Sequence, residues 1–548
     1  MPFRSIATAL FLAVPLAVSG RAAVADTLTG VPNANPKAPG VTVPSVLSPE
    51  LAQVARVQGS TPVENPNDFV KYYGYLNDQP NLLPGLGSNV EATKTEPDKN
   101  TYLVLHDLKG ADPDYDYGKH FLFQGHELGS PGSITRVNLD ADAAHRVTVL
   151  ANFEKNGTTR LPVFDGSTWY PWAERLLFSQ EGNGSTSGGI WQATPDYPSS
   201  VENLLGVLGH GGYEGMQADS DGNVWILEDI GGSVPGGEVN AKAPNSFLYR
   251  FTPKNPRDLL QGGKLKALQV VSLRSGLPIV FQTASALTDD ILDLHTYGLE
   301  FRTRWVTVHD TDVDGFAPFA ANLLAKARNA TPFKRPENGL FRPGRRFQEF
   351  FFDETGDTSN TSAANAHHGG WGSVLKLVQS SPSASNGRLS LLFKGDRAHA
   401  AFDNCAFWDE DHIVFVEDRG DGLHTDANAL DSGWLFDVDT DYSDPVRQPV
   451  RIIAQGRDPS ATVDSGLSGT TGFQNEGDNE ITGIHVSDGD PSERGLLGAK
   501  RPEPFEDGWR VFYTGQHGDN VTYEIIRAPR HGKHDDDEDD KQGFGDRR

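Results

Sequence analysis

The sequence of 548 residues contains a single cysteine, Cys405, so no disulfide bond can form within the chain. We expect this thiol to lie buried in the core. Basic residues are also few, since 48 Lys and Arg stand against 74 Asp and Glu, and the formal net charge is −26. A negative field of this kind repels phosphate backbones, which excludes nucleic acid and anionic membrane surfaces as general partners. A small phosphate ester stays acceptable if bound cations reverse the local charge.

Long apolar runs with helical spacing are scarce. The chain has 59 glycines and 35 prolines, and its 37% of apolar residues is ample for a core. This combination is typical of short strands joined by turns, so we expect an all-β fold. We expect one short helical excursion between Ala320 and Arg328. No G-x-S-x-G elbow, P-loop or dinucleotide-binding fingerprint occurs in a supporting context, which excludes the enzymes that depend on them.

The N-terminus has the pattern of an export signal. Arg4 precedes an apolar stretch from Ile6 to Val18, and Ala23-Val24-Ala25 offers a cleavage site. The stretch is short for a membrane span, although an uncleaved anchor is the alternative. No twin arginine precedes it, which favours Sec-type export. We therefore predict a signal peptide over residues 1–25 and a periplasmic or secreted protein that leaves the membrane after cleavage.

Two further segments flank the folded part. Residues 26–95 begin with frequent Pro, Asn and Gly, and we expect an N-terminal extended arm. Residues 531–548 include the unbroken run Asp535–Asp540, and we expect an acidic disordered tail. Weak, non-specific cation binding is the alternative role for this tail. Residues 96–530 remain as the folded domain, which we expect to be a monomer.

An internal repeat dominates residues 96–530. Six times an apolar strand ends in polar residues, passes a turn and meets a second strand, as in a β-hairpin. The leading strands read FLFQGHELG, RLLFSQEGNG, VWILEDIGG, EFFFDETGD, IVFVEDRGDG and RVFYTGQHGDN. Their long and uneven spacing favours a six-bladed β-propeller with insertions over a solenoid.

Four of the units carry an acidic residue at the start of an additional strand upstream of the hairpin. These residues are Glu214, Glu337, Asp403 and Glu480. In a propeller the first strands of the blades line a central channel, so the four acids would meet at one axis. Crowded carboxylates repel one another unless they are protonated or bind metal, and Ca²⁺ accepts irregular sets of oxygen ligands. The alternative is that each acid caps a turn or pairs with a local base.

Further candidate residues lie beside the strands and in the turns. Arg335 precedes Glu337 by two residues, so both share a strand face and the guanidinium can bind a phosphoryl group; a surface Arg–Glu pair is the alternative. His517 and Glu127 end strands of the sixth and first units, which are neighbours if the ring closes. A histidine there can act as a ligand or general acid, or be structural. Asp310 opens DTDVDG, which matches the first half of a calcium loop but lacks the closing Glu, so a plain turn is the alternative.

Taken together, several segments resemble the PhoX-like alkaline phosphatases. NEITGIHVSDGD followed by VFYTGQHGDN resembles the family's E-x-T-G-P … QHPG signature, and YEGMQADSDGNVWILEDIGG resembles its H-E-G-M … TED blade. RPENG, FDNCAFWDEDHIVFVED and FLFQGHELG resemble the family's R-x-E-G, P-D-N and N-H-E segments. The matches run in the family's order from about Phe121 to Asn520.

This resemblance implies a six-bladed propeller that hydrolyses phosphate monoesters at an axial cluster of iron and calcium. It implies phosphate binding by Arg335 and metal-ligand roles for Glu181, Glu214, Asp229, Glu337, Asp403 and Glu480. Glu127, Asp418 and Asp310 are secondary candidates. Where the family has the cysteine of a T-C-E-E motif, this sequence has Gln180. A thiolate is the ligand that best argues for iron, so its loss argues against Fe³⁺ and leaves Ca²⁺ as the expected cofactor.

The sequence thus supports an exported, metal-dependent phosphatase for a small phosphorylated substrate, with Arg335 and His517 as catalytic residues. The missing cysteine and the acidic tail motivate an alternative, which is a non-catalytic calcium-binding secreted propeller. Other propeller hydrolases with axial calcium, such as lactonases and phytases, form a third group.

Overall fold

The computed structural model describes residues 27–34, 45–79, 92–357, 363–419, 423, 427, 429–455, 480–516 and 520–529. The expected signal peptide, the acidic tail and the candidate His517 lie outside these residues. Within the described parts of the chain, no helix combines the length and the apolar character that a membrane crossing needs.

Antiparallel sheets of mostly four strands make up the domain, and successive strands of each repeat follow chain order from the inside outward, with β1 (Ser45–Leu47), β2 (Leu51–Val57) and β17 (Glu300–Asp310) added at outer edges. The first two sheets contain β5 (Thr101–Val104), β6 (His120–Gly125), β7 (Ile134–Asn138) and β8 (Val147–Ala151), then β9 (Ser167–Tyr170), β10 (Arg175–Gln180), β11 (Gly189–Ala193) and β12 (Val201–Asn203). The next contains β13 (Tyr213–Ala218), β14 (Val224–Glu228), β15 (Leu248–Pro253) and β16 (Gly263–Val270). It is followed by β18 (Gly339–Phe341), β19 (Glu349–Glu354), β20 (Ser373–Gln379) and β21 (Asn386–Lys394).

One long strand joins the third and fourth sheets. β17 (Glu300–Asp310) pairs with β16 on one side and β21 on the other, so the two blades form a continuous nine-stranded sheet. Short helices decorate this region: α1 (Leu205–Leu208), α2 (Asp289–Leu294), α3 (Thr311–Asp314), α4 (Ala321–Ala327) and α5 (Ala363–Ala366). Single 3₁₀ turns occur at η2 (Ala143–His145), η3 (Leu259–Gln261) and η4 (Glu493–Gly495). Helix α4 confirms the helical excursion expected over residues 320–328.

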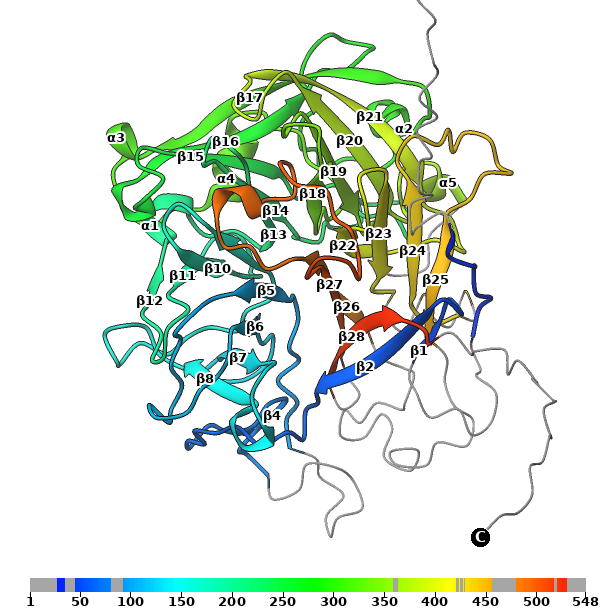
Figure 1. The fold of residues 1–548 in the computed structure, drawn as a ribbon. Helices are drawn as coiled ribbons and strands as arrows, with labels where there is room; N and C mark the ends of the chain where they lie inside the picture. The colour runs from blue at the N-terminus through cyan, green and yellow to red at the C-terminus, as the bar shows by residue number, and fades with distance from the viewer. Residues whose placement is uncertain are drawn as a thin grey trace, which may run out of the picture.

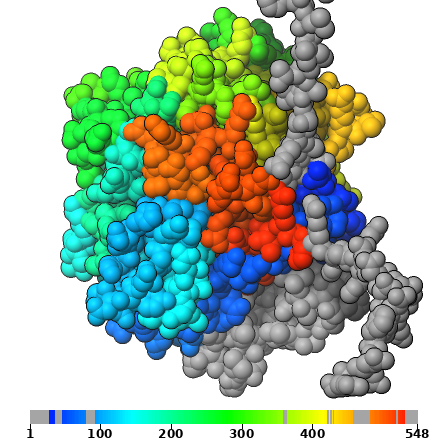
Figure 2. Space-filling view, viewed as in Figure 1, coloured from blue at the N-terminus to red at the C-terminus, as the bar shows by residue number. Residues whose placement is uncertain are grey.

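The N-terminal segment completes the last two sheets. The fifth sheet contains β22 (Phe402–Phe407), β23 (His412–Glu417), β24 (Ser432–Asp437) and β25 (Val450–Gln455), with β1 (Ser45–Leu47) at its outer edge. The sixth contains β26 (Ile481–Ser487), β27 (Arg510–Gly515) and β28 (Val521–Arg527), with β2 (Leu51–Val57) as its outer strand. Figure 2 shows the blue N-terminal segment beside the red C-terminal one. A small hairpin, β3 (Val70–Tyr72) and β4 (Tyr75–Leu76), follows.

The sheets form a closed ring around one axis (Figure 1). The innermost strands contact one another in the cyclic order β5, β9, β13, β18, β22, β26 and back to β5. Each sheet is covered on both faces, because separate apolar clusters fill the space between successive sheets. In β6, for example, Phe121 and Phe123 face the second sheet while Leu122 faces the sixth. Burial on both faces explains the unbroken apolar runs of the repeat and confirms the β-propeller predicted from sequence.

Candidate metal centre

An acidic residue stands near the start of the innermost strand of every blade. The residues are Asp98, Asp165, Glu214, Glu337, Asp403 and Glu480. The last four are the acids that the repeat predicted. Asp98 and Asp165 were missed, although TEPDKNTYLV and PVFDGSTWY carry the same acid followed by a strand. Because the innermost strands run in the same direction around the axis, their acids gather at one end of the channel.

Carboxylate oxygens at this end come within 4.8 Å of one another in three overlapping groups. The groups are Asp98–Glu127–Asp165, Asp165–Glu181–Glu214 and Glu214–Glu337–Asp403. Since Asp165 and Glu214 each belong to two groups, the residues form one continuous array, which we call the axial carboxylates. Five of the six metal-ligand candidates lie in or beside this array; Glu480 is at the start of β26, outside the three groups among the described residues.

Few positive charges accompany the axial carboxylates, and this shows in their pKa values. Burial and then the charges of Asp165 and Glu337 raise the pKa of Glu214 well above its usual range. Burial and the neighbouring Asp165 and Glu127 do the same to the pKa of Asp98. The pKa of Asp403 is also raised by burial, in spite of its hydrogen bonds. Without cations, this end of the channel therefore retains protons.

Arg335 lies at the edge of the array and is held by Asp229. Its Nε donates to Asp229 Oδ1 at 2.7 Å and its Nη2 to Asp229 Oδ2 at 2.5 Å, while Nη2 lies 3.0 Å from Glu337 Oε1. Burial alone would raise the pKa of Asp229, but the charge and hydrogen bonds of Arg335 outweigh it and lower that pKa. Arg335 adopts φ +57°, in the left-handed region that non-glycine residues rarely occupy. Such strain is typical of functional positions.

The remaining candidates divide between the array and the periphery. Glu127 belongs to the array and accepts a hydrogen bond of 2.6 Å from Gln516 Nε2. Asp418 follows β23, and its charge acts on Arg335. Asp310 ends β17, far out in its sheet from innermost strand β13, and forms an ion pair with Lys264 at 2.9 Å. The structure thus does not bring Asp310 to the axial carboxylates.

Histidine and cysteine contribute little to this centre. The buried His126 ring lies between Thr95 Oγ1, 2.7 Å from Nδ1, and Thr135 Oγ1, 2.8 Å from Nε2. Burial lowers the pKa of His126 to about 3, so the ring is neutral, and both of its nitrogen atoms are hydrogen-bonded to threonine hydroxyls. Burial also raises the pKa of the Cys405 thiol, which lies in β22 as the expected core residue.

The ligand chemistry of the axial carboxylates suits a hard cation. All the grouped atoms are carboxylate oxygens, and a buried oxygen of Asp353, Oδ2, has no hydrogen-bond partner among the described residues. The Oε1 atom of Gln516 is likewise unpartnered in the described structure. Calcium accepts irregular sets of such oxygens, whereas no thiolate is present in the array to favour iron.

Comparison with known proteins supports the fold. No protein-family model and no curated protein matches the sequence. The structure is similar to that of Pseudomonas fluorescens PhoX in complex with vanadate, a transition-state analogue. The TM-score is 0.53 at 10% identity, over 91% of this chain and 98% of that chain. A likeness to the tricorn protease, with a TM-score of 0.31 at 8% identity, covers 79% of this chain and 27% of that chain and is too distant to carry an argument.

Proposed function

We propose that this protein is a calcium-dependent phosphatase for small phosphorylated substrates, with its active site at the axial carboxylates. One observation carries the proposal: a buried carboxylate array with more acids than counter-charges has an anchored arginine at its edge. The structural likeness to PhoX, which was solved with a transition-state analogue, agrees with this reading.

The axial carboxylates would hold the cations. Glu214, Glu337 and Asp403 form the most enclosed group, since all three are buried. Asp98, Asp165, Glu127 and Glu181 extend the array, and Glu181 is its exposed member. Bound Ca²⁺ would supply positive charge to the phosphoryl oxygens and lower the pKa of a coordinated water.

Arg335 would bind and orient the phosphoryl group. Two of its nitrogen atoms are committed to Asp229, whereas Nη1 has no partner among the described residues. The side chain is 19% exposed, so Nη1 can reach a substrate in the channel mouth. A guanidinium held in this way binds developing phosphoryl charge without reorganising. We propose His517 as the general acid, since it follows Gln516, whose side chain contacts Glu127 of the array.

The test is hydrolysis of p-nitrophenyl phosphate by the metal-stripped protein before and after addition of Ca²⁺, with bis-p-nitrophenyl phosphate as the diester comparison. We expect activity only with Ca²⁺, and a fall of roughly 100-fold or more in kcat for Arg335→Met, as for loss of one preorganised donor. Arg342→Met, which removes a buried arginine outside the array, serves as the control and should keep the activity of its folded fraction. Absence of hydrolysis after reconstitution with Ca²⁺ and Fe³⁺ would remove the phosphatase proposal.

A second candidate is a calcium-binding propeller without catalysis. Gln180 favours it, because this residue occupies the position of the cysteine in the sequence pattern of the PhoX-like phosphatases. Saturable Ca²⁺ binding together with no hydrolysis of either ester would support this candidate. Export through residues 1–25 and a monomeric state remain proposals, which N-terminal sequencing of the mature protein and sedimentation analysis would test.

A further inference from the structure

One blade differs from the others directly after its axial acid. The residues at this position are Lys99, Gly166, Gly215, Asn338, Asn404 and Ile481. Five of the six side chains are uncharged, and Lys99 alone carries a full positive charge. A lysine directly beside an array of buried acids therefore needs its own explanation.

The Lys99 side chain is buried and connects to the axial carboxylates through an amide. Lys99 is 6% exposed, and its Nζ donates to Asn338 Oδ1. The other end of the same amide donates from Nδ2 to Glu214 Oε1 at 3.0 Å. Because an amide has its acceptor on one side and its donors on the other, the ammonium fixes the orientation that Asn338 presents to Glu214.

The groups that face Lys99 from the neighbouring blades are acids and neutral side chains. Burial raises the pKa values of Asp403 and Asp353, and the charge of Lys99 opposes both rises. His485 is neutral, since burial and the Lys99 charge lower its pKa to about 3. Lys99, His485 and Cys405 also line an axial cavity of about 80 Å³ between the innermost strands. The Lys99 side chain thus lies among the innermost strands, one amide away from the axial carboxylates.

We propose that Lys99 is a built-in cation of the axial carboxylates, which stabilises the metal-free ring and limits its affinity for Ca²⁺. The inference rests on the proposed calcium site. Lys99 is a positioning residue: it contacts the array through Asn338, and its fixed charge replaces part of the charge that bound ions would otherwise supply. A buried ammonium next to a cation site repels the incoming ion and so lowers the affinity for Ca²⁺. The same charge stabilises the metal-free protein, because it attracts the carboxylates.

Melting temperatures over a series of Ca²⁺ concentrations test this role in the full chain. Lys99→Gln keeps a hydrogen-bond donor for Asn338 but removes the charge, whereas Lys99→Met removes both. We expect both variants to melt lower than the wild type in chelator and to bind Ca²⁺ at least tenfold more tightly. Lys99→Arg keeps the positive charge and should therefore bind Ca²⁺ with the affinity of the wild type. If a variant folds only with Ca²⁺, the concentration at half-folding gives the affinity.

Two outcomes would overturn the inference. A calcium affinity that is unchanged or weaker in Lys99→Gln would show that Lys99 only supports the fold. An equal gain in affinity in Lys266→Met, a half-buried lysine of β16 away from the axis, would show a non-specific effect of net charge. If the wild type itself shows no calcium-dependent stabilisation, the proposed calcium site fails instead, so the two failures are distinguishable.

Discussion

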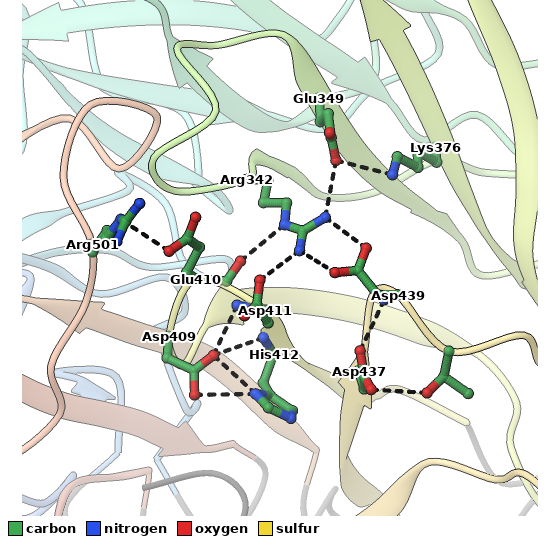
Figure 3. A network of polar contacts seen from close by, with 11 residues as sticks. Arg342, Glu349, Lys376, Asp409, Glu410, Asp411, His412, Asp437, Asp439 and Arg501 are labelled. Atoms are coloured by element: carbon green, nitrogen blue, oxygen red, sulfur yellow. Dashed lines mark hydrogen bonds and ion pairs between the residues drawn. The ribbon is translucent and has the colours of Figure 1, made fainter. Parts of the chain in front are cut away.

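The two ends of strand β18 gather carboxylates in opposite ways. At its start, Glu337 joins Glu214 and Asp403, with few bases nearby. Just beyond its end, the buried guanidinium of Arg342 is surrounded by Glu349 of β19, Asp411 and Asp439 (Figure 3). The distances from Arg342 nitrogens to these three carboxylates are 3.2, 2.5 and 2.6 Å. Both clusters join neighbouring sheets, but only in the second does one basic side chain contact all three carboxylates.

The pKa shifts record this difference. At the Arg342 end, the hydrogen bond and charge of the guanidinium lower the pKa of Asp439. At the axial end, burial raises the pKa of Glu337, because the neighbouring Arg335 cannot offset the loss of water and the other acids. A group of carboxylates is therefore not a metal site by itself; it becomes a candidate when the protein supplies too little positive charge to balance it.

The largest effect should come from Glu337→Gln, compared with Glu349→Gln near the other end of the same blade. Substituting a residue that only orients a metal ligand typically lowers metal affinity by about 10- to 100-fold. Because Glu337 would itself be a ligand, we expect Glu337→Gln to weaken Ca²⁺ binding by at least that factor. It should also stabilise the metal-free protein by relieving repulsion. Calorimetric titration and denaturation in chelator measure these effects. Equal losses of calcium affinity in both variants would abolish the distinction between the two ends.

The next effect should be the destabilisation of Arg342→Met without any change in calcium affinity. Removing the buried guanidinium leaves three carboxylates facing one another. Because Asp411 and Asp439 are half exposed, water screens their repulsion, and we expect the free energy of unfolding to fall by only about 2 kcal/mol. Urea denaturation measures the loss of stability. A changed calcium affinity in the folded variant would mean that the two ends are coupled.

A smaller effect should appear in the pH dependence of the metal-free protein. The axial acids have raised pKa values in the folded state, so the native protein binds more protons than the unfolded chain above the ordinary Glu value of 4.5. Stability should then fall as pH rises from about 5 towards 8, and saturating Ca²⁺ should remove this trend. Melting curves in chelator and in calcium would show it. Metal-free stability that rises over this interval would contradict the raised pKa values.

The smallest effect is expected for Asp310→Asn. Asp310 lies on the periphery and pairs with Lys264, whose side chain is 54% exposed, so its loss should change the melting temperature by no more than about 1 °C. Calcium titration should be unchanged. A clear drop in calcium stoichiometry would instead place a second ion at the DTDVDG turn.

Much of the fold was predictable from the sequence because both faces of each blade are buried. Runs such as FLF and FFF in the leading hairpin strands identify every blade. The pairing of β2 with β28 was not predictable, since hydrophobic periodicity does not say which distant strand supplies an edge. For the same reason the sequence of β17 did not indicate that this strand would pair with both β16 and β21 and so join two sheets. The segment assigned to an arm thus contributes outer strands to two sheets.

The candidate site was predictable in part for a similar reason. Repetition identified four acids, but the first two units were recognised only from their hairpins, so Asp98 and Asp165 were overlooked. The contact between Arg335 and Asp229 joins residues 106 positions apart, and only the closed ring brings them together. The sequence predicted that Arg335 and Glu337 share one face of a strand. The ion pair of 3.0 Å confirms that they are close, but β18 begins only at Gly339 and Arg335 adopts φ +57°, so a bend before the strand brings them together. The sequence could not show that Asp229 would bind the guanidinium.

The most direct test of the central claim is an anomalous diffraction map from crystals of the protein grown with CaCl₂. We predict calcium peaks in contact with Glu214, Glu337 and Asp403, and none beside Arg342. A map at saturating calcium with no peak among the axial carboxylates would contradict the account.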